Sequence, residues 1–182
     1  MNTIELSNLL LIGGTGRNVG KTALACQLIE KFSKSELVCS IKISPHFHSL
    51  STDCEIVEQN ENYIITIEKD FLSNKDSARM LQAGAHKVFY IQTFDNFLQE
   101  AFLKVVSQIG KNNLIICESG GLINQIKPAL FVACASPNKN EHKPVSTIFQ
   151  NLCDLWLVFE NNLVDENWER ITIDNKKWII EI

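Results

Sequence analysis

Short runs of apolar residues alternate along the chain with polar stretches. The runs are Leu9–Ile12, Leu37–Ile43, Val88–Ile91, Leu114–Cys117, Leu130–Ala135 and Leu155–Phe159. They lack a regular apolar–polar alternation, which is typical of strands buried on both faces. The pattern therefore predicts an α/β fold with three layers, in which a mostly parallel sheet is flanked by helices.

Helical spacing of apolar residues marks two further segments. Phe94–Ile109 has apolar residues at i, i+3 and i+4, with Thr93 as its expected cap and Gly110 as its stop. A shorter helix is expected over Lys75–Ala83, capped by Ser73. We interpret both helices as structural.

Three other segments complete this outline. Pro45–Asn62 is polar and without a strong period, which predicts a long loop, and long loops in compact domains are often functional. Tyr63–Glu68 is expected to form an extra strand. The tail Arg170–Ile182 is typical of a hairpin that turns near Asp174-Asn175.

The first apolar run leads directly into a glycine-rich turn that ends in Gly-Lys-Thr and opens a helix. In such a loop, backbone N–H groups and the helix N-terminus bind phosphate, the lysine reaches the outer phosphates, and the hydroxyl can ligate magnesium. The sequence therefore predicts a nucleotide-phosphate site. Its candidate residues are Gly14, Gly16, Asn18, Val19, Gly20, Lys21, Thr22 and Ala23.

The spacing of this loop is irregular. In the pattern G-x-x-x-x-G-K-[ST] the first glycine would stand at Thr15, whereas Gly14 precedes that position and Gly16 follows it, so the loop is one residue longer. The alternative is a tight strand-to-helix connection with an exposed lysine. The hydrophobic strand before the loop, and the helical spacing of Leu24 and Leu28 after it, favour phosphate binding.

Glu118 follows the apolar run Leu114–Cys117, at the end of an expected buried strand. A carboxylate there can hold magnesium or orient a nucleophile in phosphoryl transfer. We expect Lys21, Glu118 and Arg17 to be catalytic and Thr22 with Glu118 to hold Mg²⁺. The alternatives are that Glu118 is a polar residue leaving the sheet at a turn, and that Arg17 points to solvent.

The long loop offers further polar candidates. His46 and His48 form an H-x-H pair, but no other ligand stands at close spacing, so exposed or ligand-contacting loop histidines are the better interpretation. Asp53 and Glu55 could reach magnesium or could simply be solvated.

Ser136–Glu141 follows another apolar run and contains Asn138-Lys139 with Glu141. These residues are similar to the N-K-x-D pattern with which GTPases bind guanine, although glutamate replaces the aspartate. A plain polar loop is the alternative.

Composition narrows the range of partners. The 182 residues suit a single domain over 1–182, and the net charge of −4, from 17 basic and 21 acidic residues without a basic block, argues against a nucleic-acid partner. No membrane-length apolar run or signal peptide is present, so we expect a cytoplasmic protein with no membrane partner. The six cysteines include no C-x-x-C and are expected to be reduced core thiols.

Four segments in order resemble the molybdopterin-guanine dinucleotide biosynthesis adaptor family (MobB). They are the phosphate loop, Ile41-Lys42 leading to Pro45-His46-Phe47-His48, Lys75-Asp76-Ser77-Ala78-Arg79 with Ala83-Gly84-Ala85, and Ile116-Cys117-Glu118. The resemblance implies a P-loop NTPase fold and a GTP-binding homodimer with slow hydrolysis. Its implied partner is a guanylyltransferase that attaches GMP to molybdopterin.

The longer loop and the stretch Glu118–Leu122 are more similar to dethiobiotin synthetases of the same P-loop class. That resemblance implies ATP and magnesium driving closure of a urea-type ring on a diamine. Both resemblances imply a magnesium–nucleotide held by Lys21 and Thr22, with Glu118 beside the metal. A third hypothesis is a non-catalytic module that uses bound nucleotide as a switch, because no general base stands near Lys21 in the sequence.

Overall fold

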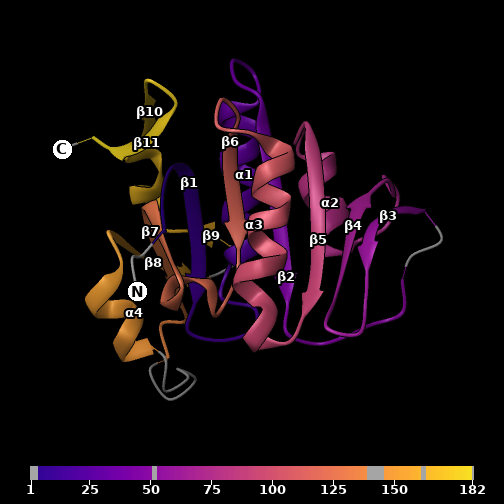
Figure 1. The fold of residues 1–182 in the computed structure, drawn as a ribbon. Helices are drawn as coiled ribbons and strands as arrows, with labels where there is room; N and C mark the ends of the chain where they lie inside the picture. Colours follow the sequence, from indigo (N-terminus) through magenta and orange to yellow (C-terminus); the bar gives the residue numbers. More distant parts are fainter. Residues whose placement is uncertain (1–3, 51–52, 139–145, 161–162, 182) are drawn as a thin grey trace.

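The computed structural model describes residues 4–50, 53–138, 146–160 and 163–181. Within them, nine strands form one sheet in the order β3-β4-β5-β2-β6-β1-β7-β8-β9 (Figure 1). The strands are β1 (Ile4–Gly14), β2 (Val38–Ser44), β3 (Cys54–Gln59), β4 (Tyr63–Glu68), β5 (Lys87–Thr93), β6 (Leu114–Glu118), β7 (Ile126–Ala135), β8 (Leu155–Glu160) and β9 (Leu163–Val164).

The six neighbouring strands from β5 to β8 are parallel, and β3, β4 and β9 are added antiparallel at the edges. Each of the six apolar runs falls in one of the parallel strands, apart from Leu37, which immediately precedes β2. The predicted α/β fold with a mostly parallel sheet is therefore confirmed, and the extra strand Tyr63–Glu68 is confirmed with the same bounds as β4.

Helices lie on both faces of the sheet (Figure 1). α3 and α4 pack on one face, and α1 and α2 pack on the other together with the hairpin β10–β11. The bounds are α1 (Lys21–Phe32), α2 (Asp76–Gln82), α3 (Leu98–Ile109), α4 (Ser146–Leu152), β10 (Ile171–Asp174) and β11 (Lys177–Ile180), with short 3₁₀ turns η1 (Asp95–Phe97), η2 (Leu122–Asn124) and η4 (Glu166–Arg170).

The two faces explain the uninterrupted apolar runs. In β1, Leu9 and Leu11 belong to the core on the face covered by α3 and α4, whereas Leu10 and Ile12 belong to the core on the face covered by α1 and α2, and all four side chains are fully buried. Successive residues of a strand point to opposite faces, so a strand covered on both sides needs an apolar residue at every position. Burying a side chain of this size contributes about 1.5–3 kcal/mol.

Both expected helix caps are wrong. The α2 helix begins after Lys75, and no side chain caps it, so Ser73 does not serve there. The hydroxyl of Thr93 donates to the carbonyl oxygen of Phe94, and the helical segment begins after Phe94 with no side-chain cap. The stop at Gly110 is confirmed, with φ +80°.

Pro45–Asn62 is not a continuous loop, because β3 occupies its second half and pairs antiparallel with β4. This edge strand is mostly exposed or half-buried and has an irregular register after Ile56, so it carries no apolar period. The C-terminal hairpin is confirmed. Its turn residues Asn175 and Lys176 have φ of +48° and +62°, as a two-residue hairpin turn requires.

All six cysteines are free thiols, as expected, and Cys39, Cys117 and Cys134 are buried. Burial raises the pKa of the Cys26 thiol to about 11 and that of Cys134 to about 12. No helix within the described residues is long and apolar enough to cross a membrane.

Candidate functional site

A cleft of about 1010 Å³ opens at the carboxyl ends of the central strands β1, β2 and β6. In open parallel sheets, ligands bind at this edge. One wall is the glycine-rich loop between β1 and α1, and another is formed by Ser119, Gly120 and Gly121 after β6. Lys42, Asp76 and Glu118 also line it.

The loop has a backbone that few residue types can adopt. Asn18 and Gly20 have φ of +56° and +84°, in the left-handed region. Gly20 immediately precedes α1, and the N–H of Thr15 donates to the carbonyl oxygen of Cys134 at 2.9 Å, which fixes the loop to β7. The loop therefore lies at the positive end of the α1 dipole, beside the first N–H groups of the helix, which have no acceptor within the helix.

Two glycines are required by close packing. A Cβ on Gly20 would lie 2.4 Å from Cδ2 of Phe159, and one on Gly14 would lie 2.8 Å from both Cδ of Lys21 and Cγ2 of Val19. Real Cβ atoms do not approach other atoms so closely, so a side chain at either position would displace its neighbours. This longer loop therefore requires glycine at positions 14 and 20, whereas the common pattern would place its first glycine at position 15.

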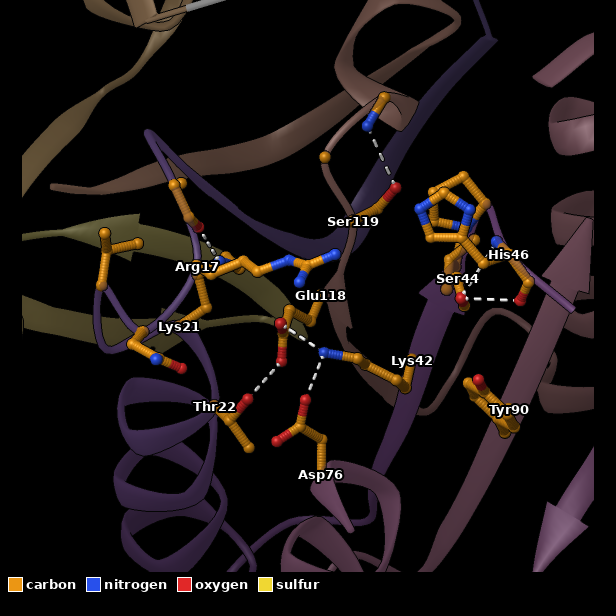
Figure 2. A pocket seen from close by; sticks show the side chains of 18 of the residues that line it. Arg17, Lys21, Thr22, Lys42, Ser44, His46, Asp76, Tyr90, Glu118 and Ser119 are labelled. Atoms are coloured by element: carbon orange, nitrogen blue, oxygen red, sulfur yellow. Dashed lines mark hydrogen bonds and ion pairs between the residues drawn. The ribbon is translucent and has the colours of Figure 1, made fainter. Parts of the chain in front are cut away.

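Lys21 lies across the loop, and its Nζ donates to the carbonyl oxygen of Gly16 at 2.7 Å. Arg17 is exposed and lines the cleft beside it (Figure 2). Both cations lie on the side of the cleft where the helix N-terminus already favours an anion. Val19 and Ala23 line the same wall.

Four side chains from different elements meet on the α1 and α2 side of the sheet (Figure 2). The hydroxyl of Thr22 donates to Oε2 of Glu118 at 2.8 Å. The Nζ of Lys42 donates to Oε1 of Glu118 at 2.5 Å and to Oδ2 of Asp76 at 2.7 Å. A single ammonium group therefore bridges two carboxylates, one of which also accepts from the first turn of α1.

The sheet register accounts for this arrangement. Glu118 lies between Ile12 of β1 and Lys42 of β2 in neighbouring strands. Alternation along the strands puts both charged side chains on the face covered by α1 and α2. Thr22 and Asp76 stand in the first turns of those helices, so all four side chains meet at one edge.

Because these side chains are partly or fully buried, the charge of each one strongly affects the ionisation of the others. The Glu118 side chain is only 3% exposed and that of Lys42 only 17%, whereas Asp76 is 42% exposed. Burial acts to lower the pKa of Lys42, but the two carboxylates outweigh it and raise that pKa above its ordinary value. Burial also opposes ionisation of Asp76, yet Lys42 holds the pKa of that carboxyl below its ordinary value.

Lys42 and Asp76 were not among the candidates drawn from their chemistry, although both lie in segments that carry the family resemblance. A signal was present, because Lys42 is the one charged residue in the run Leu37–Ile43. A lysine within a buried strand needs an acidic partner. That Glu118 is this partner becomes clear only from the strand order, which puts Lys42 of β2 directly beside Glu118 of β6.

Other candidates are not brought into this network. His46 and His48 are exposed and line the outer part of the cleft, with ring centres 6.4 Å apart. Glu55 forms an ion pair with Lys69, and Asp53 is exposed. Asn138 is exposed and does not line the cleft, and Lys139 and Glu141 lie outside the described residues.

In the part of the chain that the structure describes, no three His, Cys, Asp or Glu side chains gather as a metal site. Magnesium in phosphoryl-transfer proteins is held by one or two protein oxygens together with phosphates and water. Thr22 Oγ1 and Glu118 Oε2 offer such a pair of hard oxygen ligands, already oriented toward each other.

Comparison with protein-family models and with curated proteins gave no match to this chain, so its function is inferred from the chemistry of the cleft.

Proposed function

We propose that the chain is a P-loop protein that binds a magnesium–nucleoside triphosphate in the cleft and hydrolyses it slowly. The observation that carries the proposal is the glycine-rich loop at the carboxyl end of β1, directly before α1, with Thr22 of that helix bonded to Glu118 of β6. Phosphate recognition, a metal ligand and an acidic partner are thereby combined in one place.

Phosphate binding is supported by the donors of the loop. The N–H groups at the start of α1 have no acceptor within the helix. The first turn of α1 contains no acidic residue that would compete with a phosphate for these groups. Lys21 bonds to Gly16 within the loop, so its ammonium group needs only a change of side-chain rotamer to reach an outer phosphate. The one-residue extension relative to the common pattern is accommodated by the left-handed residues Asn18 and Gly20.

Magnesium is the ion that suits Thr22 and Glu118, and when bound it would neutralise charge on the outer phosphates. Thr22 and Glu118 would hold that ion. Lys42 keeps the Glu118 carboxylate in position and compensates its charge. Hydrolysis is proposed to be slow because Asp76 and Glu118 are both engaged by Lys42.

GTP is the nucleotide we favour over ATP, on the resemblance to MobB and on the similarity of Asn138-Lys139 in the sequence to the guanine-binding pattern of GTPases. On the same resemblance, the protein would act in the cytoplasm as a homodimer that assists a guanylyltransferase. An ATP-dependent ligase of the dethiobiotin synthetase type is the second candidate, and the longer loop favours it.

The test is a titration of the purified chain with fluorescent GTP and ATP analogues, each with and without magnesium. Lys21→Ala should weaken binding at least about tenfold, since it removes a charge-assisted contact to phosphate. Lys111→Ala is the matched control, because Lys111 is exposed and lies at the turn before β6, at the opposite end of that strand.

Equal and negligible binding by the wild type and Lys21→Ala would overturn the proposal. A strict preference for GTP would remove the ligase, and turnover that needs ATP with a diamine and bicarbonate would support it. Tight binding with hydrolysis no faster than that of free nucleotide would favour the non-catalytic switch.

A further inference from the structure

A second cavity of about 380 Å³ adjoins the cleft. The two spaces share Lys42, Asp76, Tyr90 and His48 in their walls. The rest of the second cavity is formed by β3, β4, the segment after β2 and the start of α2. The Lys42–Asp76 ion pair therefore stands at the boundary between them.

Glu68 lies in the wall of this cavity and is only 4% exposed. Its Oε1 accepts from the N–H groups of Lys69 and Asp70 at 3.1 and 3.0 Å, and its Oε2 accepts from the hydroxyl of Ser77 at 2.6 Å. Two carboxylate oxygens have about four acceptor positions, so capacity for a further donor remains.

No basic side chain within the described residues forms an ion pair with Glu68. Two lysines, Lys42 and Lys75, line the same cavity. Lys42 already donates to Glu118 and Asp76, and Lys75 is exposed at the cavity wall. A buried carboxylate without a cation is costly, and a cationic group that enters the cavity would offset that cost. Glu68 therefore favours a ligand that carries a cationic or N–H donor group.

The remaining wall is suited to an apolar body. Leu50, Cys54 and Tyr90 line it and are each half-buried, and the cavity is within the size range of small-molecule sites. Such sites combine apolar walls with a small number of placed polar groups that fix orientation.

We propose that this cavity is a separate binding site for a small molecule that presents an ammonium or N–H donor to Glu68 and places an apolar body against Leu50 and Tyr90. The far end of such a molecule meets the Lys42–Asp76 pair, so it would be a second ligand beside the main cleft. Its binding does not depend on whether the main cleft takes a nucleotide.

The test uses Cys54 as a reporter, because this residue lines the cavity and is half-buried. The rate of Cys54 alkylation by iodoacetamide is followed by peptide mass spectrometry with benzylamine or benzyl alcohol present. These probes share a ring and differ in charge. Benzylamine at four times its Kd should slow alkylation about fivefold, and benzyl alcohol less than about twofold.

Glu68→Gln should remove the protection by benzylamine, since it removes the charge and keeps the shape. Glu55→Gln is the matched control, because Glu55 is an exposed carboxylate next to Cys54 that pairs with Lys69 at the surface. Alkylation of Cys153, which does not line the cavity, is the internal reference.

Equal protection by the two probes, or benzylamine protection unchanged in Glu68→Gln, would overturn the proposal. Glu68 would then serve only to hold the backbone at Lys69 and Asp70 and the hydroxyl of Ser77. Loss of protection in Glu55→Gln alone would assign the effect to surface charge and overturn it as well. If Glu68→Gln does not fold, Asn74→Trp replaces it, because Asn74 is an exposed residue at the cavity wall and a large ring there should block both probes. Nucleotide titration of the same variants separates this result from a failure of the proposed nucleotide site.

Discussion

Thr22 Oγ1 donates a 2.8 Å hydrogen bond to Glu118 Oε2, although 96 positions separate the two residues in the sequence. The other oxygen of the same carboxylate accepts from Lys42 at 2.5 Å. Both oxygens are therefore oriented by protein groups. In the proposed magnesium site, oxygens held in this way would need little rearrangement to accept the ion, because contacts around metal ligands fix their orientation.

Thr22→Val should lower the affinity for magnesium–nucleotide by roughly 10- to 100-fold, because it removes an oxygen ligand and leaves Glu118 with one partner fewer. The measurement is a titration with and without magnesium. Thr22→Ser keeps the hydroxyl and is expected to retain most of the affinity. Equal loss in both variants would mean that the methyl group, and not the oxygen, matters at this position.

Lys42→Met should destabilise the fold by about 3 kcal/mol, because it leaves Glu118 buried without its cation. Adding Glu118→Gln to Lys42→Met should restore part of that loss, which chemical denaturation of the single and double variants would measure. Asp76→Asn should cost less than about 1 kcal/mol, since that carboxylate is 42% exposed and partly screened. A Lys42→Met variant as stable as the wild type would contradict a coupled network.

Gly20→Ala should destabilise the protein by more than about 1–2 kcal/mol, since a left-handed residue that is not glycine already costs that much. The added clash with Phe159 comes on top of the backbone strain. Gly120→Ala is the matched control in the same cleft, because a Cβ there would meet no atom within 4 Å. Thermal unfolding of the two variants should differ clearly, and equal melting temperatures would show that the loop adapts.

Stability should depend on pH through Asp76. Its pKa in the folded state lies below the ordinary 3.8, so the stabilisation it provides is present above that pH and is lost as the pH falls through the folded value. The difference in free energy of unfolding between wild type and Asp76→Asn should therefore be constant at neutral pH and shrink in acid. A difference that persists unchanged to about pH 2 would contradict the linkage.

The thiols should react in two groups. Cys117 and Cys134 are fully buried with raised pKa values, and alkylation of both should require unfolding. Cys54 is half-buried and should react in the native protein. Peptide mass spectrometry at several denaturant concentrations would measure this order, and early labelling of Cys117 would contradict the packing of β6.

Much of this fold follows from local pattern. A strand covered on both sides must be apolar throughout, so the six parallel strands are visible as runs, and Gly110 marks a helix end by its left-handed backbone. Edge strand β3 is not visible, because its mostly solvent-facing side chains carry no period. The two cap predictions failed for different reasons. α2 begins only after Lys75, two residues beyond Ser73, and the Thr93 hydroxyl donates to the carbonyl oxygen of Phe94.

The candidate site could be predicted only as separate pieces. The loop and Glu118 were identified from residue type and position after a strand. Their contact depends on β6 lying beside β1, which follows from strand order and not from spacing along the chain. The same order puts β6 between β1 and β2, and that is why Lys42 reaches Glu118.

The hairpin β10–β11 inserts Trp178 beneath α1, where its indole N–H donates to the carbonyl oxygen of Asn8 at 2.9 Å and its ring meets Phe32 edge-on. The contact joins residues 170 positions apart. During synthesis on the ribosome, the helix that follows the glycine-rich loop therefore cannot complete its packing until the hairpin has emerged.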